Sequence, residues 1–327
     1  MVPAPLPPSG PPCLTGAGGL HEEQGKREMW LRVLGSAAGG GYPQWNCSCP
    51  TCRAVRDGTR PTRARTQSSI AVSLDRERWF LFNASPDIRA QFEAFAGLHP
   101  GDDRTTPLQA VLLTDAEIDH TLGLLLLREG RGIRLHATEA TYTTLTSGSG
   151  VLTTLERYCP VEWTRVVPGQ DVSLGGISYR AFDVPTAKHD RFGSGTAEGR
   201  VVGYRLTDES TGRAAVYLPG VQVLTPAVHE ELEECACLLI DGTCWHDDEL
   251  IRLGLAGKTA HEMGHLAIGG PGGSLEQLSR LPIERKIYIH INNTNPILLE
   301  DSPERREVER SGMEVASDGL EVEVKAR

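Results

Sequence analysis

Leu112-Leu113-Thr114-Asp115-Ala116-Glu117-Ile118-Asp119-His120-Thr121-Leu122-Gly123 is the stretch that decides how this chain of 327 residues is interpreted. The apolar residues 110–113 predict a short buried strand, and the leucines 124–127, after a turn at Gly123, predict the start of a helix. Three carboxylates and one imidazole therefore follow a strand end, where α/β folds place their chemistry. Clustered acids are stable when solvated or when a cation neutralises them, so this stretch alone predicts either a solvated turn or a metal site.

The composition excludes some classes of protein. A hydrophobic content of 39% suffices for one large core or two modest ones, and a formal net charge of −10 disfavours nucleic acids and anionic membranes as partners. The sequence contains no apolar run long enough to span a membrane. Residues 1–27 are rich in Pro and Gly and lack the pattern of a signal peptide. We expect a disordered tail over 1–27, a single domain over 28–327, and a location in the cytoplasm.

A cluster of cysteines indicates a second metal site. Cys47, Cys49 and Cys52 lie within six residues of one another, in a chain of eight cysteines for which the cytoplasm disfavours disulfides. Thiolates at this spacing reach one Zn²⁺ from a single turn, so we expect a structural zinc, with a fourth ligand that the sequence does not identify. The alternative is a chance cluster of thiols. The cysteines at 235, 237 and 244 lie in or near an apolar strand and are expected in the core.

Three later strands also end in polar or turn residues. Asp241-Gly242-Thr243 follows the apolar run 235–240, His290 lies in the run 286–291, and Pro219-Gly220 follows 214–218. Each is weak alone, because Asp-Gly after a strand is usually a turn. Together with Asp119 and His120 they form a set of strand ends that could converge on one pocket. Further strands are expected at 29–34, 68–74, 78–83, 133–137, 172–182 and 201–206, with helices at 139–145 and from residue 88, the latter capped by Asp87.

His261-Glu262-Met263-Gly264-His265 matches the pattern of the zincins, in which two His one helical turn apart bind zinc. That site needs a stable helix, whereas Gly264 lies inside this motif and glycines follow it at 269–273. We therefore predict that the match is coincidental and that His261 is not a ligand. His265 by itself can still point into a pocket.

The motifs follow one another in a recognisable order: a Gly-rich loop, an acidic-His motif at a strand end, Asp-Gly-Thr, Gly-His and a strand-end His. In this order the chain, from about Met29 onward, resembles the metallo-β-lactamase superfamily, whose signature is His-x-His-x-Asp-His, and within it the pyrroloquinoline quinone (PQQ) biosynthesis protein B family. The segments that carry the resemblance are 35–41, 43–47 with Cys49 and Cys52, 65–72, 83–89, 263–265 and 290–296. The resemblance implies an αββα sandwich of two mixed β-sheets flanked by helices.

The departures from the superfamily signature define the expected chemistry. Asp115 and Glu117 stand where its hydrolases carry the first two His, and the bridging Asp is replaced near Pro219-Gly220, so the two-zinc centre is incomplete on one side. The ligands that remain are Asp119, His120 and His290. Two His and one carboxylate with open positions form the ligand set of non-haem Fe(II) oxygenases.

The resemblance implies a role in PQQ biosynthesis: O₂-dependent hydroxylation, at Fe²⁺, of the tyrosine ring of a precursor derived from Glu-Tyr. Asp241 and His265 are candidates for proton transfer, and Asp115 and Glu117 for binding a second cation or the substrate amine. Three alternatives stay open: a carrier of PQQ or its precursor, a hydrolase with two metals, and a scaffold without metal. The expected partners are the small-molecule or dipeptide substrate and other proteins of the PQQ pathway, and the sequence leaves a homodimer open.

Overall fold

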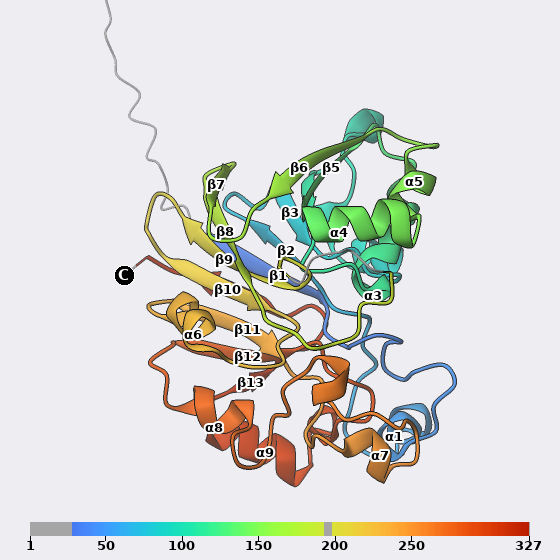
Figure 1. Cartoon of the computed structure of the whole chain (residues 1–327), viewed down its shortest axis with the longest axis vertical. Helices are drawn as coiled ribbons and strands as arrows, with labels where there is room; N and C mark the ends of the chain where they lie inside the picture. The colour runs from blue at the N-terminus through green and yellow to red at the C-terminus, as the bar shows by residue number, and fades with distance from the viewer. Residues whose placement is uncertain (1–27, 193–197, 327) are drawn as a thin grey trace, which may run out of the picture.

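The computed structural model describes residues 28–192 and 198–326, so the tail expected at 1–27 lies outside the described residues. Within these residues two seven-stranded mixed sheets pack face to face, with helices on the outside (Figure 1). The order of the first sheet is β14 (Glu321–Val324), β1 (Met29–Gly35), β2 (Ser69–Ser73), β3 (Trp79–Phe82), β4 (Leu108–Leu112), β5 (Ile133–Thr138) and β6 (Val161–Val166). The order of the second sheet is β13 (Glu314–Val315), β12 (Arg285–Ile289), β11 (Cys237–Asp241), β10 (Ala214–Leu218), β9 (Val202–Asp208), β8 (Ile177–Asp183) and β7 (Asp171–Leu174). The predicted αββα sandwich is confirmed.

Parallel pairing brings the functional strand ends together. Strands β3 to β6 are parallel neighbours in one sheet, and β10 to β13 are parallel neighbours in the other. The carboxyl ends of β4, β11 and β12 carry the polar motifs that the sequence indicated. An isolated bridge between Ala37 and Ile291 joins the Gly-rich loop after β1 to the segment after β12, and so ties the two sheets together beside these ends. This edge is where α/β folds bind ligands.

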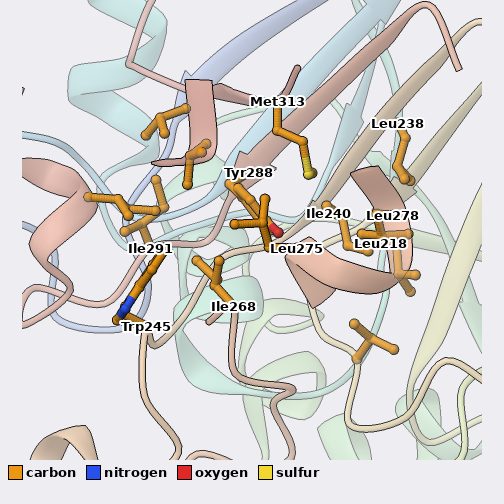
Figure 2. Close-up of a cluster of buried hydrophobic side chains, with 14 of the residues drawn as sticks. Leu218, Leu238, Ile240, Trp245, Ile268, Leu275, Leu278, Tyr288, Ile291 and Met313 are labelled. Atoms are coloured by element: carbon orange, nitrogen blue, oxygen red, sulfur yellow. The ribbon is translucent and has the colours of Figure 1, made fainter. Parts of the chain in front are cut away.

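Three layers of apolar side chains hold the sandwich together. The inner layer combines residues of both sheets, such as Leu31 and Leu112 with Leu206 and Leu239. The other two layers lie between each sheet and its helices; Figure 2 shows part of the one beneath the second sheet, including Tyr288. The helices are α1 (Pro50–Asp57), α2 (Ile88–Glu93), α3 (Ile118–Thr121), α4 (Glu139–Thr143), α5 (Val151–Leu155), α6 (Pro226–Leu232), α7 (Glu249–Arg252), α8 (Ser274–Ser279) and α9 (Pro303–Arg310).

Most of the predicted elements are present, and four details differ. The run 172–182 was expected as one strand but forms the hairpin β7–β8, because Gly175 and Gly176 adopt positive φ. Asp87 makes no side-chain cap on α2; its carboxylate instead accepts hydrogen bonds from Gln67. Helical structure begins at Ile118 and includes Gly123, which was expected as a turn. Glycine is needed at this position because a side chain would meet the Ala84–Ser85 backbone. Strands β6, β13 and β14 were missed.

No helix in the described parts of the chain has the length and apolar character that a bilayer span requires.

Candidate metal centre

The loop after β4 is shaped by hydrogen bonds that extend from Asn83 to Asp115 and Glu117. Asn83 adopts a positive φ of 63° after β3, and its side chain accepts a hydrogen bond of 3.0 Å from the Thr114 backbone. The Thr114 hydroxyl lies 2.8 Å from Asp115 Oδ2, and Asp115 Oδ1 accepts the backbone N–H of Glu117. These contacts fix the Asp115 carboxylate at the start of α3, directly behind His120.

His120 is held in the orientation that a metal ligand needs. Its Nδ1 lies 2.8 and 2.9 Å from the two carboxylate oxygens of Asp115, and the ring is buried. Its Nε2 is also buried and, in the part of the chain that the structure describes, has no hydrogen-bond partner. A histidine that binds a metal through one nitrogen usually donates the other N–H to a carboxylate. Because buried polar atoms are nearly always satisfied, the unpaired Nε2 indicates a site for a cation.

Asp119 and His290 complete this group. His290 follows β12 with a positive φ of 55°, and its Nε2 lies 3.3 Å from Asp119 Oδ2. Asp119 Oδ2 is also 3.9 Å from His120 Nε2. One ligand atom from each of these three residues lies within 4.8 Å of the others. Left-handed backbone at a non-Gly residue is costly and clusters at functional sites, so the conformation of His290 is a further indication of function.

The acidic and basic side chains of this pocket shift one another's pKa. Burial raises the pKa of Asp119, but the neighbouring His120 and His290 hold it well below its usual range. Burial lowers the pKa of His290, but the hydrogen bond to Asp119 and the carboxylate of Asp241 raise it to about 10. Because the pKa of His290 is raised, a metal ion that bound its ring would compete with a proton. The donor set of two imidazoles and one carboxylate fits a divalent transition metal.

A second group of polar side chains lies behind His290. Asp241 Oδ2 is 2.6 Å from His265 Nδ1, and the Thr243 hydroxyl is 2.6 Å from Asp241 Oδ1 and 3.0 Å from His290 Nδ1. The rings of His265 and His290 stack with centroids 5.3 Å apart. One ligand atom from each of Asp241, His265 and His290 also lies within 4.8 Å of the others. Their close atoms are engaged in short hydrogen bonds with one another, which favours a hydrogen-bonded support over a second ion.

The structure gives Asp115 and Glu117 partners that the sequence did not indicate. Both Asp115 oxygens contact His120, so we revise its expected role from cation or amine binding to orienting His120. Glu117 forms an ion pair of 2.8 Å with Lys188 from the loop after β8. A side chain at Gly264 would meet the Lys188 stem at 3.2 Å, so Lys188 spans the space between Gly264 and Glu117. A partner for Glu117 so distant in the chain left no signal in the sequence.

Cys47, Cys49 and Cys52 are buried, and their sulfurs lie within 4.8 Å of one another, as the expected zinc site requires. The Asn293 side-chain amide lies 3.3 Å from the sulfur of Cys52, and Thr51 donates a hydrogen bond to the carbonyl of Asn293. The cysteine cluster is therefore packed against the segment that follows His290. Within the described residues, no fourth His, Cys, Asp or Glu joins this group.

His261 and His265 do not share an α-helix. His261–Met263 is a single 3₁₀ turn, and Gly264 ends it with a φ of 95°. The Gln222 amide nitrogen lies 3.3 Å from His261 Nδ1, while His265 faces Asp241. This geometry supports the prediction that the zincin match is coincidental.

Sequence reasoning missed Asn83 and Thr243 as site residues. Thr243 was part of a strand-end motif, but its hydroxyl matters because it reaches two histidines from other segments. Asn83 follows the apolar strand β3, and that position was the available signal.

Comparison with known proteins agrees with this fold and site. The β-lactamase superfamily domain matches residues 78–291, and the chain is a member of that superfamily. The coenzyme PQQ synthesis protein B of Methylococcus capsulatus is 46% identical over 307 residues, which cover 90% of this chain and 99% of that protein. The corresponding protein of Azoarcus sp. is 46% identical over 304 residues, or 89% of this chain and 99% of its own length. The chain belongs to the coenzyme PQQ synthesis protein B family.

Solved structures give the same result. The Zn²⁺-bound PqqB from Methylobacterium extorquens superposes with a TM-score of 0.83 at 39% identity, over 90% of this chain and 99% of that one. A diphosphatase of the PhnP family superposes with a TM-score of 0.65 at 23% identity, over 90% of this chain and 97% of the other, and shows the shared fold alone.

Proposed function

We propose that this protein acts in PQQ biosynthesis as an Fe²⁺- and O₂-dependent hydroxylase of the tyrosine ring in a precursor derived from Glu-Tyr. The observation that carries the proposal is the group of Asp119, His120 and His290, with the unpaired, buried Nε2 of His120 facing the same space. Membership of the PQQ synthesis B family supports the pathway. The single carboxylate and two imidazoles support a redox-active metal in preference to the two-metal centre of the superfamily's hydrolases.

The metal would be held by Asp119 Oδ2, His120 Nε2 and His290 Nε2. Fe²⁺ bound by these residues would supply one-electron chemistry toward O₂. The overall reaction replaces a ring C–H by C–OH: one oxygen atom of O₂ enters the ring, and the other leaves as water with two electrons and two protons from a two-electron reductant such as ascorbate. The residues around the metal must position the ring, exclude water and handle these protons.

Asp115 and the Asp241 group supply the second part of the arrangement. Asp115 fixes the ring of His120 through Nδ1, which leaves Nε2 for the metal. Asp241 likewise contacts Nδ1 of His265, so Nε2, on the opposite side of that ring, would be the atom that exchanges a proton with the substrate. Glu117 and Lys188 form an ion pair, and in this proposal Glu117 would contact the amine of the substrate and Lys188 its carboxylate.

The cysteine cluster is proposed to bind a structural Zn²⁺ that fixes the loop preceding α1. The buried sulfurs and their contacts with Asn293 support this role, because they connect that loop to the segment after His290. We also propose that residues 28–327 form one domain, since the inner core draws on both sheets.

Reconstitution tests the hydroxylase. Metal-free protein is loaded with Fe²⁺ or Zn²⁺ and incubated aerobically with ascorbate and Glu-Tyr peptides, and catechol formation is followed by mass spectrometry. Catechol is expected from the Fe²⁺-loaded protein and not from the Zn²⁺-loaded protein. The variants Asp119→Ala, His120→Ala and His290→Ala should each abolish catechol formation and reduce bound iron. His261→Ala is the matched control and should keep both iron and turnover. Turnover that is equal with Zn²⁺, or equal under argon, would contradict the proposal.

A further inference from the structure

Thr243 contacts more of the groups behind the metal pocket than any other side chain of the Asp241 group. It follows β11, and its side-chain oxygen lies 2.6 Å from Asp241 Oδ1, 3.0 Å from His290 Nδ1 and 3.1 Å from His265 Nδ1. The residue is 4% exposed, so bulk water does not compete for these contacts. One buried hydroxyl therefore joins a carboxylate to two histidines that come from separate segments of the chain.

The hydroxyl has a single proton, and the geometry determines where it goes. Two groups within reach can only accept this proton: Asp241 Oδ1 at 2.6 Å and the His290 carbonyl oxygen at 3.1 Å. The ionised carboxylate gives the shorter and stronger hydrogen bond. The backbone N–H of Thr243 donates to the same oxygen at 3.0 Å, which fixes the carboxylate from a second direction. The hydroxyl proton therefore points to Asp241, and the lone pairs of the Thr243 oxygen face the histidines.

This assignment determines the tautomer of His290. An oxygen that donates to Asp241 can only accept from His290 Nδ1, so Nδ1 must carry a proton. In the neutral ring Nε2 then has the lone pair, and Nε2 is the atom that lies 3.3 Å from Asp119 Oδ2. Asp241 Oδ1 is 3.9 Å from His290 Nδ1, too far for a direct hydrogen bond, so Asp241 acts on His290 through the Thr243 hydroxyl.

We propose that Thr243 is a positioning residue that connects Asp241 to His290 and selects the Nδ1–H tautomer of His290, so that Nε2 binds the active-site metal. In His120 the carboxylate of Asp115 contacts Nδ1 directly, whereas in His290 the Thr243 hydroxyl stands between Nδ1 and the carboxylate of Asp241. The inference rests on the metal pocket of the proposed function and does not depend on which reaction that metal supports.

Nitrogen NMR of the ¹⁵N-histidine-labelled protein, loaded with Zn²⁺ as a diamagnetic probe, tests this inference. In the wild type the His290 ring should show a protonated Nδ1 and a metal-bound Nε2. The same resonances, followed during a Zn²⁺ titration, give the affinity of this pocket separately from that of the cysteine cluster. The reverse pattern, with metal on Nδ1 or a protonated Nε2, would overturn the proposal without the need for any variant.

Two variants sharpen the test. Thr243→Val keeps the shape but removes the hydroxyl, and should weaken Zn²⁺ binding in this pocket by about 10- to 100-fold and remove the single His290 tautomer. Thr243→Ser keeps the hydroxyl and should restore both within about threefold, because the support of a metal-binding histidine comes from the hydrogen bond and not from the methyl group. Thr138→Val is the matched control, because it removes a buried hydroxyl that caps α4 and bonds Gly199, and contacts no histidine.

The outcomes separate this inference from the proposed reaction. Unchanged affinity and tautomer in Thr243→Val would overturn the role of Thr243, as would the absence of any metal at His290 in the wild type. Metal bound with the predicted tautomer, but with no hydroxylation under any condition, would contradict the hydroxylase and support the role of Thr243.

Discussion

His120 Nδ1 lies 2.8 Å from Asp115 Oδ2, while Nε2 of the same buried ring has no hydrogen-bond partner among the described residues. The two nitrogens of one imidazole thus have different roles: one is fixed by a carboxylate and the other faces Asp119. Asp115, which stands where the superfamily signature has its first His, contacts the ring of His120 and does not add another imidazole.

The first prediction concerns this carboxylate. Asp115→Asn keeps the shape but replaces the charged acceptor, so it should lower the affinity of the Asp119 pocket for Zn²⁺ or Fe²⁺ by about 10-fold or more. Glu117→Gln is the matched control, because it removes a nearby charge but leaves His120 supported. Chelator-competition titrations give both affinities, and equal losses in the two variants would show that charge alone, and not orientation, is responsible.

The second prediction concerns Gly39, which packs against the metal-facing carboxylate. A side chain at this position would lie 3.2 Å from Asp119 Oδ2, and the backbone conformation of Gly39 suits other residues. Gly39→Ala should therefore displace Asp119 and lower metal affinity about 10-fold, with little change in melting temperature. Gly257→Ala, where a side chain would meet nothing within 4 Å, should leave affinity intact. Wild-type affinity in Gly39→Ala would argue against Asp119 as a ligand.

The third prediction concerns the cysteine cluster. Cys49→Ser should remove about one equivalent of zinc and lower the melting temperature, because metal binding at such a loop contributes folding free energy. The Asp119 pocket should still bind metal. Zinc content is measured by atomic absorption on protein purified without chelator, with Cys159→Ser as the control at a buried cysteine outside the cluster. An unchanged zinc content in Cys49→Ser would disprove the assignment.

The fourth prediction concerns acid stability at the β2–β3 turn. Asp75 accepts hydrogen bonds from the backbone of Glu77 and Arg78 and from the Arg78 side chain. Partial burial raises the pKa of Asp75, but these hydrogen bonds lower it to about 2. A lowered pKa stabilises the fold above the unfolded-state value, about 3.9, and this contribution is lost as the pH falls toward about 2.

Asp75→Asn should therefore flatten the decline of stability between pH 4 and pH 2 by about 1 kcal/mol, a value that allows for solvent screening at this partly exposed site. Urea denaturation at a series of pH values measures the difference. Parallel stability curves for the wild type and the variant would contradict the role of Asp75.

The site shows which features are local in the sequence and which are not. Asp119, His120 and His290 could be predicted because each follows an apolar strand, and strand ends meet in this class of fold. The partners of Asp115 and Glu117 could not, since pairing with His120 or Lys188 depends on how loops cross. Strand β6 was missed because it is a largely exposed edge strand, Val161–Val166, whose pattern lacks a continuous apolar run.

The origin of the new oxygen atom distinguishes hydroxylation by O₂ from hydrolytic chemistry. The Fe²⁺-loaded protein, with ascorbate and a Glu-Tyr peptide, is incubated under ¹⁸O₂ in ordinary water and, in parallel, under ordinary O₂ in ¹⁸O-labelled water. The account predicts a catechol that carries one ¹⁸O atom from the gas and none from the solvent, and no product with Asp119→Ala. A product labelled from water, or the absence of product alongside tight binding of finished PQQ, would contradict the account and favour hydrolytic chemistry or a carrier, respectively.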